Sequence, residues 1–213
     1  MVKLFREIAR LLHKREGFVL ATLFDRSGSM PRLAGAKMIV HSDGSISGTI
    51  GGGRLEAETR EIAREILTSR KTLMRSFDLT GKDVAAMDMI CGGKGEVLID
   101  YIDADNENIR KVYQAAADTL DRREKAWLVT ALRRDTDGAS LKRQICLVKP
   151  DKTFVGKMDC EPYLLEKLMA GPAKISIHAE IYENQRFLVE PLRQTGRAVI
   201  FGAGHVSQRI APL

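Results

Sequence analysis

Apolar residues near the start of the chain recur at helical spacing and then form a continuous run. Residues 1–17 carry apolar side chains every three or four positions, which predicts an amphipathic helix. Its apolar face consists of Leu4, Ile8, Leu11 and Leu12. The run 17–25 predicts a buried strand, and residues 36–50 predict a hairpin that turns at positions 43–44. The chain therefore opens with both helix and strand.

The two patterns continue to alternate as far as residue 192. After a run of glycines, a helix is predicted from about Arg54 to Thr68. Later patterns predict strands at 72–80, 96–102, 126–134 and 142–149, helices at 106–123 and 161–169, loops at 26–35 and 81–95, and two strands within 173–192. This order predicts the α/β class: a mixed-sheet N-terminal domain with flanking helices over residues 1–192.

The last segment, "GRAVIFGAGHVSQRIAPL", changes character. An apolar strand at 198–201 leads into a GxG turn and the start of a helix, as in the opening of a dinucleotide-binding βαβ unit. A complete unit needs roughly 30 residues or more. Residues 197–213 therefore predict either the first strand and helix start of a Rossmann-like domain or only a terminal strand and helix.

Composition narrows the class of ligand. The net charge of +6 favours anionic partners, but the basic residues are scattered and only one Trp and four Tyr are available for stacking, which argues against nucleic acid. No apolar run approaches the roughly 18 residues that cross a membrane. Without an export signal, the protein is expected in the cytoplasm. The three cysteines form no CxxC pair, so reduced thiols are expected.

Two glycine-containing loops suit an anion. In residues 28–38, Arg32 offers a planar fork for phosphate or carboxylate on a loop stiffened by Pro31, although a structural loop with a solvated arginine fits equally. The glycines 51–53 precede a helix, where their amides favour an anion nest. Arg54 lies in the first turn, where the helix dipole disfavours a cation unless an anion binds. The alternative is a plain glycine hinge.

Two further loops are weaker candidates. Cys91 precedes two glycines in a polar loop, which favours an accessible thiolate, although a single cysteine is more often inert. Cys146 and Cys160 are interpreted as packing residues. In "GAGHVS", His205 could face a ligand phosphate or be an ordinary surface residue, and Ser207 replaces the third glycine of GxGxxG.

Four stretches in this order, "GSMPRLAGAKMIV", "GTIGGGRLEAE", "CGGKGEVLID" and "AVIFGAGHVS", resemble the xanthine dehydrogenase accessory proteins, the XdhC/CoxI maturation factors of molybdenum hydroxylases. The resemblance implies a cytoplasmic factor, more chaperone than catalyst, that binds molybdenum cofactor and assists its sulfuration and insertion. It implies a molybdenum hydroxylase such as xanthine dehydrogenase, a cysteine desulfurase and a second copy in a homodimer as partners, and NAD(P) for an intact C-terminal domain.

The resemblance also carries site positions over to this chain. The cofactor-binding positions that it implies are Ser29, Pro31, Arg32, Gly35, Gly51, Gly52, Gly53, Arg54, Glu56, Cys91, Gly92, Gly93, Gly202, Gly204 and His205. Cys91 is placed near the molybdenum, and no catalytic residue is implied. Many relatives have a cysteine where this chain has Arg54, and the chain ends early in the Rossmann-like domain. Two alternatives remain: an NAD(P)- or flavin-dependent oxidoreductase using "GAGHVS", and a module that only docks on the hydroxylase.

Overall fold

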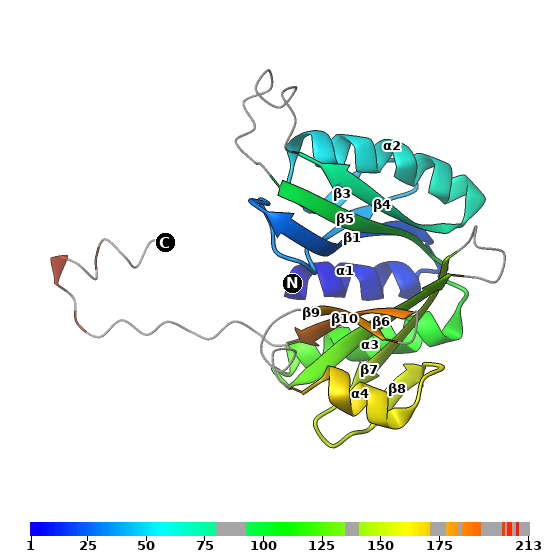
Figure 1. Cartoon of the computed structure of the whole chain (residues 1–213), viewed down its shortest axis with the longest axis vertical. Coiled ribbons are helices and arrows are strands. Elements are labelled where there is room, and N and C mark those ends of the chain that lie inside the picture. The colour runs from blue at the N-terminus through cyan, green and yellow to red at the C-terminus, as the bar shows by residue number, and fades with distance from the viewer. Residues whose placement is uncertain are drawn as a thin grey trace.

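The computed structural model describes residues 1–79, 93–134, 141–170, 178–182 and 185–192, together with Gly202, Gly204, His205 and Gln208. Within these residues the chain forms two five-stranded sheets, in which every strand pair is antiparallel, and four helices. The predicted α/β class with flanking helices is confirmed (Figure 1). The predicted mixed sheet is corrected to two sheets, because all the described strand pairs are antiparallel.

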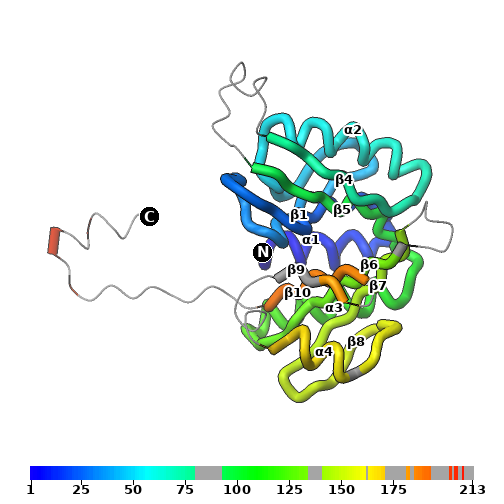
Figure 2. The backbone as a smooth tube through the Cα atoms, viewed as in Figure 1, coloured from blue at the N-terminus to red at the C-terminus, as the bar shows by residue number. Residues whose placement is uncertain are grey.

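The first sheet contains the residues of the predicted anion-binding loops. Its strands are β1 (Phe18–Gly28), β2 (Lys37–Val40), β3 (Ile46–Gly48), β4 (Thr72–Asp78) and β5 (Gly93–Ile102), in the order β3-β2-β1-β5-β4. Helix α2 (Gly53–Ser69) covers one face, where Leu55, Ala63 and Ile66 pack in one apolar cluster with side chains of β1 and β5. Figure 2 shows α2, β4, β5 and β1 stacked in the upper half of the molecule.

The second sheet has the same number of strands. They are β6 (Ala126–Arg134), β7 (Leu141–Val148), β8 (Phe154–Lys157), β9 (His178–Tyr182) and β10 (Gln185–Leu192), in the order β8-β7-β6-β10-β9. Helix α4 (Pro162–Leu168) packs Leu164, Leu165 and Leu168 against the outer face of this sheet.

The inner faces of the two sheets share one interior. Helices α1 (Val2–His13) and α3 (Glu107–Asp121) contribute to a core cluster that also contains residues of both sheets. Away from these helices the sheets meet directly, through a cluster of Phe24, Leu98, Leu132 and Leu188. The amphipathic pattern predicted for the first helix is confirmed, because Ile8, Leu11 and Leu12 are all buried.

Two ion pairs cross this interior. The Lys37 Nζ of β2 lies 2.6 Å from Glu190 Oε1 of β10, and both side chains are less than 5% exposed. The Arg143 Nε of β7 lies 2.5 Å from Asp100 Oδ2 of β5, and the Thr72 hydroxyl donates to the other oxygen of Asp100. Burial raises the pKa of Asp100, although the charge of Arg143 opposes the shift. Each pair joins one sheet to the other.

Most predicted elements are confirmed within a residue or two, including the hairpin turn and the pairing of 126–134 with 142–149. Two predicted loops were too long, because β1 continues to Gly28 and β5 begins at Gly93, where the two strands still pair. Strand β8 was not predicted.

Strand β1 also contains a bulge. Leu23 pairs with Val97, but Asp25 pairs with Glu96, so Phe24 is an additional residue without a partner in the register. In the described part, no helix is long and apolar enough to span a bilayer.

We expect Lys37→Met to destabilise the fold by about 3–5 kcal/mol, because it leaves the carboxylate of Glu190 buried without its cation. The double variant Lys37→Met/Glu190→Leu should recover most of this loss, since no charge is then left buried. Urea unfolding measures both effects. Arg15→Met, which breaks an exposed pair with Asp105, is the control and should cost less than about 1 kcal/mol. Equal losses for Lys37→Met and Arg15→Met would contradict this view of the interior.

Candidate functional site

Three of the four motif segments meet at one end of the first sheet. Strand β1 ends at Gly28, strand β5 begins at Gly93, and these two glycines are register partners. Between Gly28 and Gly35 the chain forms the loop that carries Ser29, Pro31 and Arg32, and the side chains of these three residues are exposed. Three motifs that are separate in the sequence therefore lie together at this end of the first sheet.

Close backbone approach explains the glycine at 93. A Cβ built there would lie 2.7 Å from the carbonyl oxygen of Ser27 and 2.9 Å from Met30 Cγ. Real Cβ atoms do not come so close to backbone atoms, so any side chain would push the 28–35 loop away from β5. Gly95 lies under the same loop, with Met30 Cε 2.8 Å from its built Cβ.

The second motif touches the first through Gly51. Its built Cβ lies 3.2 Å from Pro31 Cγ and 3.2 Å from Leu55 Cδ2. Gly51 and Gly52 have φ angles of 147° and 79°, which side-chain-bearing residues rarely adopt. The glycines thus let the chain turn sharply into α2 while staying in contact with the proline loop.

Glu56 closes this glycine loop. Its Oε1 accepts hydrogen bonds from the Thr49 hydroxyl at 2.5 Å and from the amides of Ile50, Gly51 and Gly52 at 3.0, 3.3 and 2.8 Å. Burial alone would raise the pKa of Glu56, but these four donors together outweigh it and hold the pKa below its usual value. The loop therefore folds around a carboxylate of its own chain.

This geometry changes how the predicted anion nest must be interpreted. The amides of Gly51 and Gly52 already bind the Glu56 carboxylate, so a ligand at the loop would meet chiefly the exposed Gly53, whose amide at the first helical position has no intrahelical acceptor. Arg54 pairs with Glu58 one turn along the helix, so an internal carboxylate offsets the unfavourable position of its charge. Phosphate binding at residues 51–53 stays a prediction.

The remaining predicted positions are not brought into this cluster by the described structure. Cys91 and Gly92 lie outside the described residues. Gly202, Gly204 and His205 are exposed, and no heavy atom lies within 4 Å of a Cβ built at either glycine. The Gln208 amide donates to the Gly204 carbonyl at 3.1 Å, a helical hydrogen bond directly after the GxG turn. Burial raises the pKa of Cys146 to about 12, consistent with a packing role.

A cleft that the sequence reasoning missed lies beside the motif loops. Its volume is about 400 Å³, and it is lined by Asp25, Arg26, Ser27, Ser76, Phe77, Asp78, Lys94, Gly95 and Glu96 from the ends of β1, β4 and β5. Lys94 pairs with Asp78 at 2.9 Å, and Arg186 of β10 pairs with Glu96. The sequence feature that could have revealed this cleft is the change at the strand ends from apolar residues to charged and polar ones.

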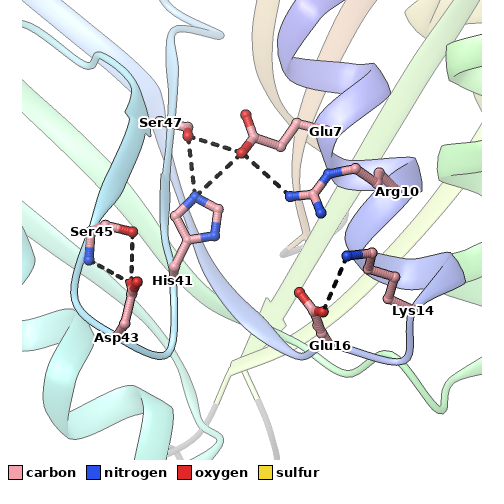
Figure 3. A network of polar contacts seen from close by, with 8 residues as sticks. All are labelled: Glu7, Arg10, Lys14, Glu16, His41, Asp43, Ser45 and Ser47. Atoms are coloured by element: carbon pink, nitrogen blue, oxygen red, sulfur yellow. Dashed lines mark hydrogen bonds and ion pairs between the residues drawn. The ribbon is translucent and has the colours of Figure 1, made fainter.

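Another polar cluster, shown in Figure 3, joins α1 to the β2–β3 hairpin. The Ser47 hydroxyl donates to Glu7 Oε1 at 3.0 Å and lies 3.1 Å from His41 Nε2, and the same Nε2 lies 3.4 Å from Glu7. A nucleophilic triad needs the acid on the other ring nitrogen from the serine, so this cluster is a structural link. Across the described ranges, no group of three or more His, Cys, Asp and Glu residues is arranged to hold a metal ion.

Comparison with known proteins supports the family resemblance that was inferred from the sequence motifs. The sequence model of the XdhC and CoxI family matches residues 11–78, which include the proline loop and the triple glycine. The resemblance to this family is confirmed. The uncharacterized protein YqeB of Escherichia coli (strain K12) is 36% identical to the chain over 98 residues, which is 46% of this chain and 18% of that protein.

The fold also has a solved counterpart. A crystal structure described as a xanthine dehydrogenase from Bacillus halodurans superimposes with a TM-score of 0.63 at 17% identity, covering 89% of this chain and 52% of that one. At this identity the likeness concerns the fold. The present chain spans about half the length of that protein and less than a fifth of YqeB.

We expect Glu56→Gln to lower stability at pH 7 by about 1–3 kcal/mol, because an amide oxygen accepts the four donors less strongly and its NH₂ group faces donors. Since the folded-state pKa of Glu56 lies below its usual value, its stabilisation is full above the unfolded pKa and disappears as pH falls through the folded pKa. The difference between variant and wild type in thermal unfolding should therefore shrink below about pH 4. Glu61→Gln, on an exposed part of the same helix, should change little at any pH. A pH-independent loss for Glu56→Gln would contradict the proposed contact.

We expect Gly93→Ala to destabilise the protein by about 1–3 kcal/mol and to loosen the proline loop, because the methyl group collides with backbone atoms of β1. Hydrogen exchange of the amides in residues 27–30 should accelerate in the variant. Gly204→Ala is the matched control, since nothing lies within 4 Å of its added Cβ. Unchanged exchange at the loop would show that the contact at Gly93 does not hold it.

Proposed function

We propose that this protein is a maturation factor that binds molybdenum cofactor and assists its sulfuration and insertion into a xanthine dehydrogenase-type molybdenum hydroxylase. The observation that supports the proposal best is the convergence of the three family motifs at the end of β1 and β5, through Gly28, Gly51 and Gly93. Motifs that are distant in sequence and meet in space are typical of a shared binding site. The family match over residues 11–78 supports the same function.

The exposed groups around these loops suit the phosphate of the cofactor. Arg32, Gly53 and Arg54 are all exposed, and they offer two guanidinium groups and a helix N-terminal amide to an anion. The negative charge of Glu56 disfavours a second anion on the amides of Gly51 and Gly52, so in this proposal Glu56 shapes the loop and the two arginines hold the phosphate. Cys91 is proposed to approach the molybdenum end.

The remaining parts of the proposal concern the setting. We place the protein in the cytoplasm, as a chaperone for the cofactor, with a hydroxylase such as xanthine dehydrogenase as client, a cysteine desulfurase as sulfur source and a homodimer as its assembly. Residues 1–192 would form the N-terminal domain and 197–213 the start of a Rossmann-like domain that takes NAD(P). The helical hydrogen bond from Gln208 to Gly204 supports that start, and it is the one observation that favours the alternative of a nucleotide-dependent oxidoreductase.

Copurification tests the proposal. We expect the wild-type protein, expressed in a host that makes molybdenum cofactor, to retain molybdopterin, which is measured as its fluorescent oxidised derivative together with molybdenum by mass spectrometry. Arg32→Ala should lower retention by about tenfold or more, because a charge-assisted pair to phosphate is lost. Gly52→Val should also lower it, since φ at Gly52 is 79° and a branched residue would distort the loop.

Arg15→Ala removes an exposed arginine that pairs with Asp105, and it serves as the matched control, with retention expected to equal the wild type. Absence of molybdopterin from the wild-type protein would overturn the proposed function. Retention that is insensitive to both Arg32→Ala and Gly52→Val would overturn the assignment of the site and leave the function standing.

A further inference from the structure

The cleft beside the motif loops is large enough for a fused bicyclic ring. Its volume of about 400 Å³ falls in the usual range of small-molecule sites, roughly 300–1,000 Å³. Its polar lining comes from three neighbouring strands, which are more rigid supports than loops. None of the positions predicted from the sequence as ligand contacts is among the residues that line it.

The bulge in β1 changes which side chains of this strand lie beside Glu96 and Lys94. Before the bulge, Leu23 packs with Val97 in the apolar cluster beneath α2. After it, Asp25 pairs with Glu96 and Ser27 with Lys94, and all four residues line the cleft. Phe24 packs between the sheets with Leu98, and the guanidinium of Arg186 lies 5.1 Å from its ring centroid. The aromatic residue that lines the cleft is Phe77 of β4. The cleft therefore combines carboxylates and cations next to an aromatic residue.

Among the cleft carboxylates, Asp25 differs in its partners. Asp78 pairs with Lys94 and Glu96 pairs with Arg186. Asp25 makes no ion pair with any described residue, and its Oδ1 accepts a hydrogen bond from the Arg26 amide at 2.7 Å. This bond orients the carboxylate, while Oδ2 and the second lone pair of Oδ1 stay available as acceptors. A charged acceptor that is held in place and lacks a counter-ion suits a ligand with two adjacent N–H donors.

We propose that Asp25 recognises the 2-amino-4-oxopyrimidine edge of a pterin bound in this cleft. This edge presents a ring N–H and an exocyclic amino N–H side by side, which matches the two oxygens of a carboxylate in a bidentate, charge-assisted pair. The inference rests on the proposed function, since the molybdenum cofactor is a pyranopterin. In this proposal two neighbouring regions bind different parts of one ligand. The cleft binds the heterocycle, and the arginines of the motif loops bind the phosphate. Guanine carries the same donor edge, so the test must separate the two sources.

Titration of purified wild-type protein with 6-hydroxymethylpterin, followed by its fluorescence, tests the proposal. The comparison ligand is 6-hydroxymethyllumazine, in which a carbonyl replaces the 2-amino group and removes one donor. We expect the pterin to bind about tenfold or more tightly than the lumazine, and Asp25→Asn to abolish most of this preference. Asp105→Asn, which removes a carboxylate beyond the opposite end of β5 (Gly93–Ile102), should leave it unchanged.

The outcomes separate the two proposals. If the wild type retains molybdopterin on purification but Asp25→Asn keeps the preference for pterin over lumazine, the assignment of Asp25 is wrong and the maturation function stands. The same holds if the wild type fails to discriminate between the two ligands. If guanosine monophosphate binds more tightly than the pterin in an Asp25-dependent manner, the cleft reads guanine and the pterin assignment is overturned. If neither molybdopterin nor pterin binds, both proposals fail.

Discussion

The two sheets are joined by charges buried away from solvent, and this constraint governs the rest of the architecture. Each sheet contributes one cation and one anion to the interior: Lys37 and Asp100 come from the first sheet, and Arg143 and Glu190 from the second. Each charge finds its counter-ion on the opposite sheet. Sliding one sheet over the other would separate both pairs at once, so the charges fix the relative placement of the sheets more sharply than apolar contact alone would.

Fixed sheets give the motif loops a rigid base. Strands β1 and β5 pass through the shared interior and continue to the end where Gly28 meets Gly93. There the chain replaces side chains with glycine, which brings the backbone of the proline loop into direct contact with β5. Glu56 then supplies from α2 the anion that the glycine amides need. The loops are shaped before any ligand arrives, which lowers the entropic cost of binding.

Local sequence patterns predicted the helices and strands but not the contacts between them. The apolar periodicity of α1 and α2 and the runs of β1, β6 and β7 were strong enough to place most boundaries within two residues. The sequence also identified the glycine loops as special. It did not reveal that Glu56 turns back onto residues 50–52, because that contact depends on how the loop folds. The pairing of Lys37 with Glu190 spans 153 positions, and no local pattern encodes such a partner.

The cleft escaped sequence reasoning for a related reason. Simple alternation along β1 places Asp25 on the same side as Leu23, which is the side of α2. The additional residue Phe24 reverses the alternation, so Asp25 and Ser27 turn toward the cleft with Glu96 and Lys94. A bulge of this kind has no clear signature in a single sequence, because Leu23 and Phe24 look like the ordinary end of an apolar run that is followed by polar residues.

The bulge has a consequence for comparing this chain with proteins that resemble it. The identity of the residue at position 24 matters less than the number of residues between Leu23 and Asp25. In a homologue that lacks the bulge residue, the aspartate would lie on the face covered by α2, and different side chains would line the cleft. This would hold even if all the other aligned residues were identical. The number of residues at this point, as well as their identity, therefore determines which side chains of β1 lie beside Glu96 and Lys94.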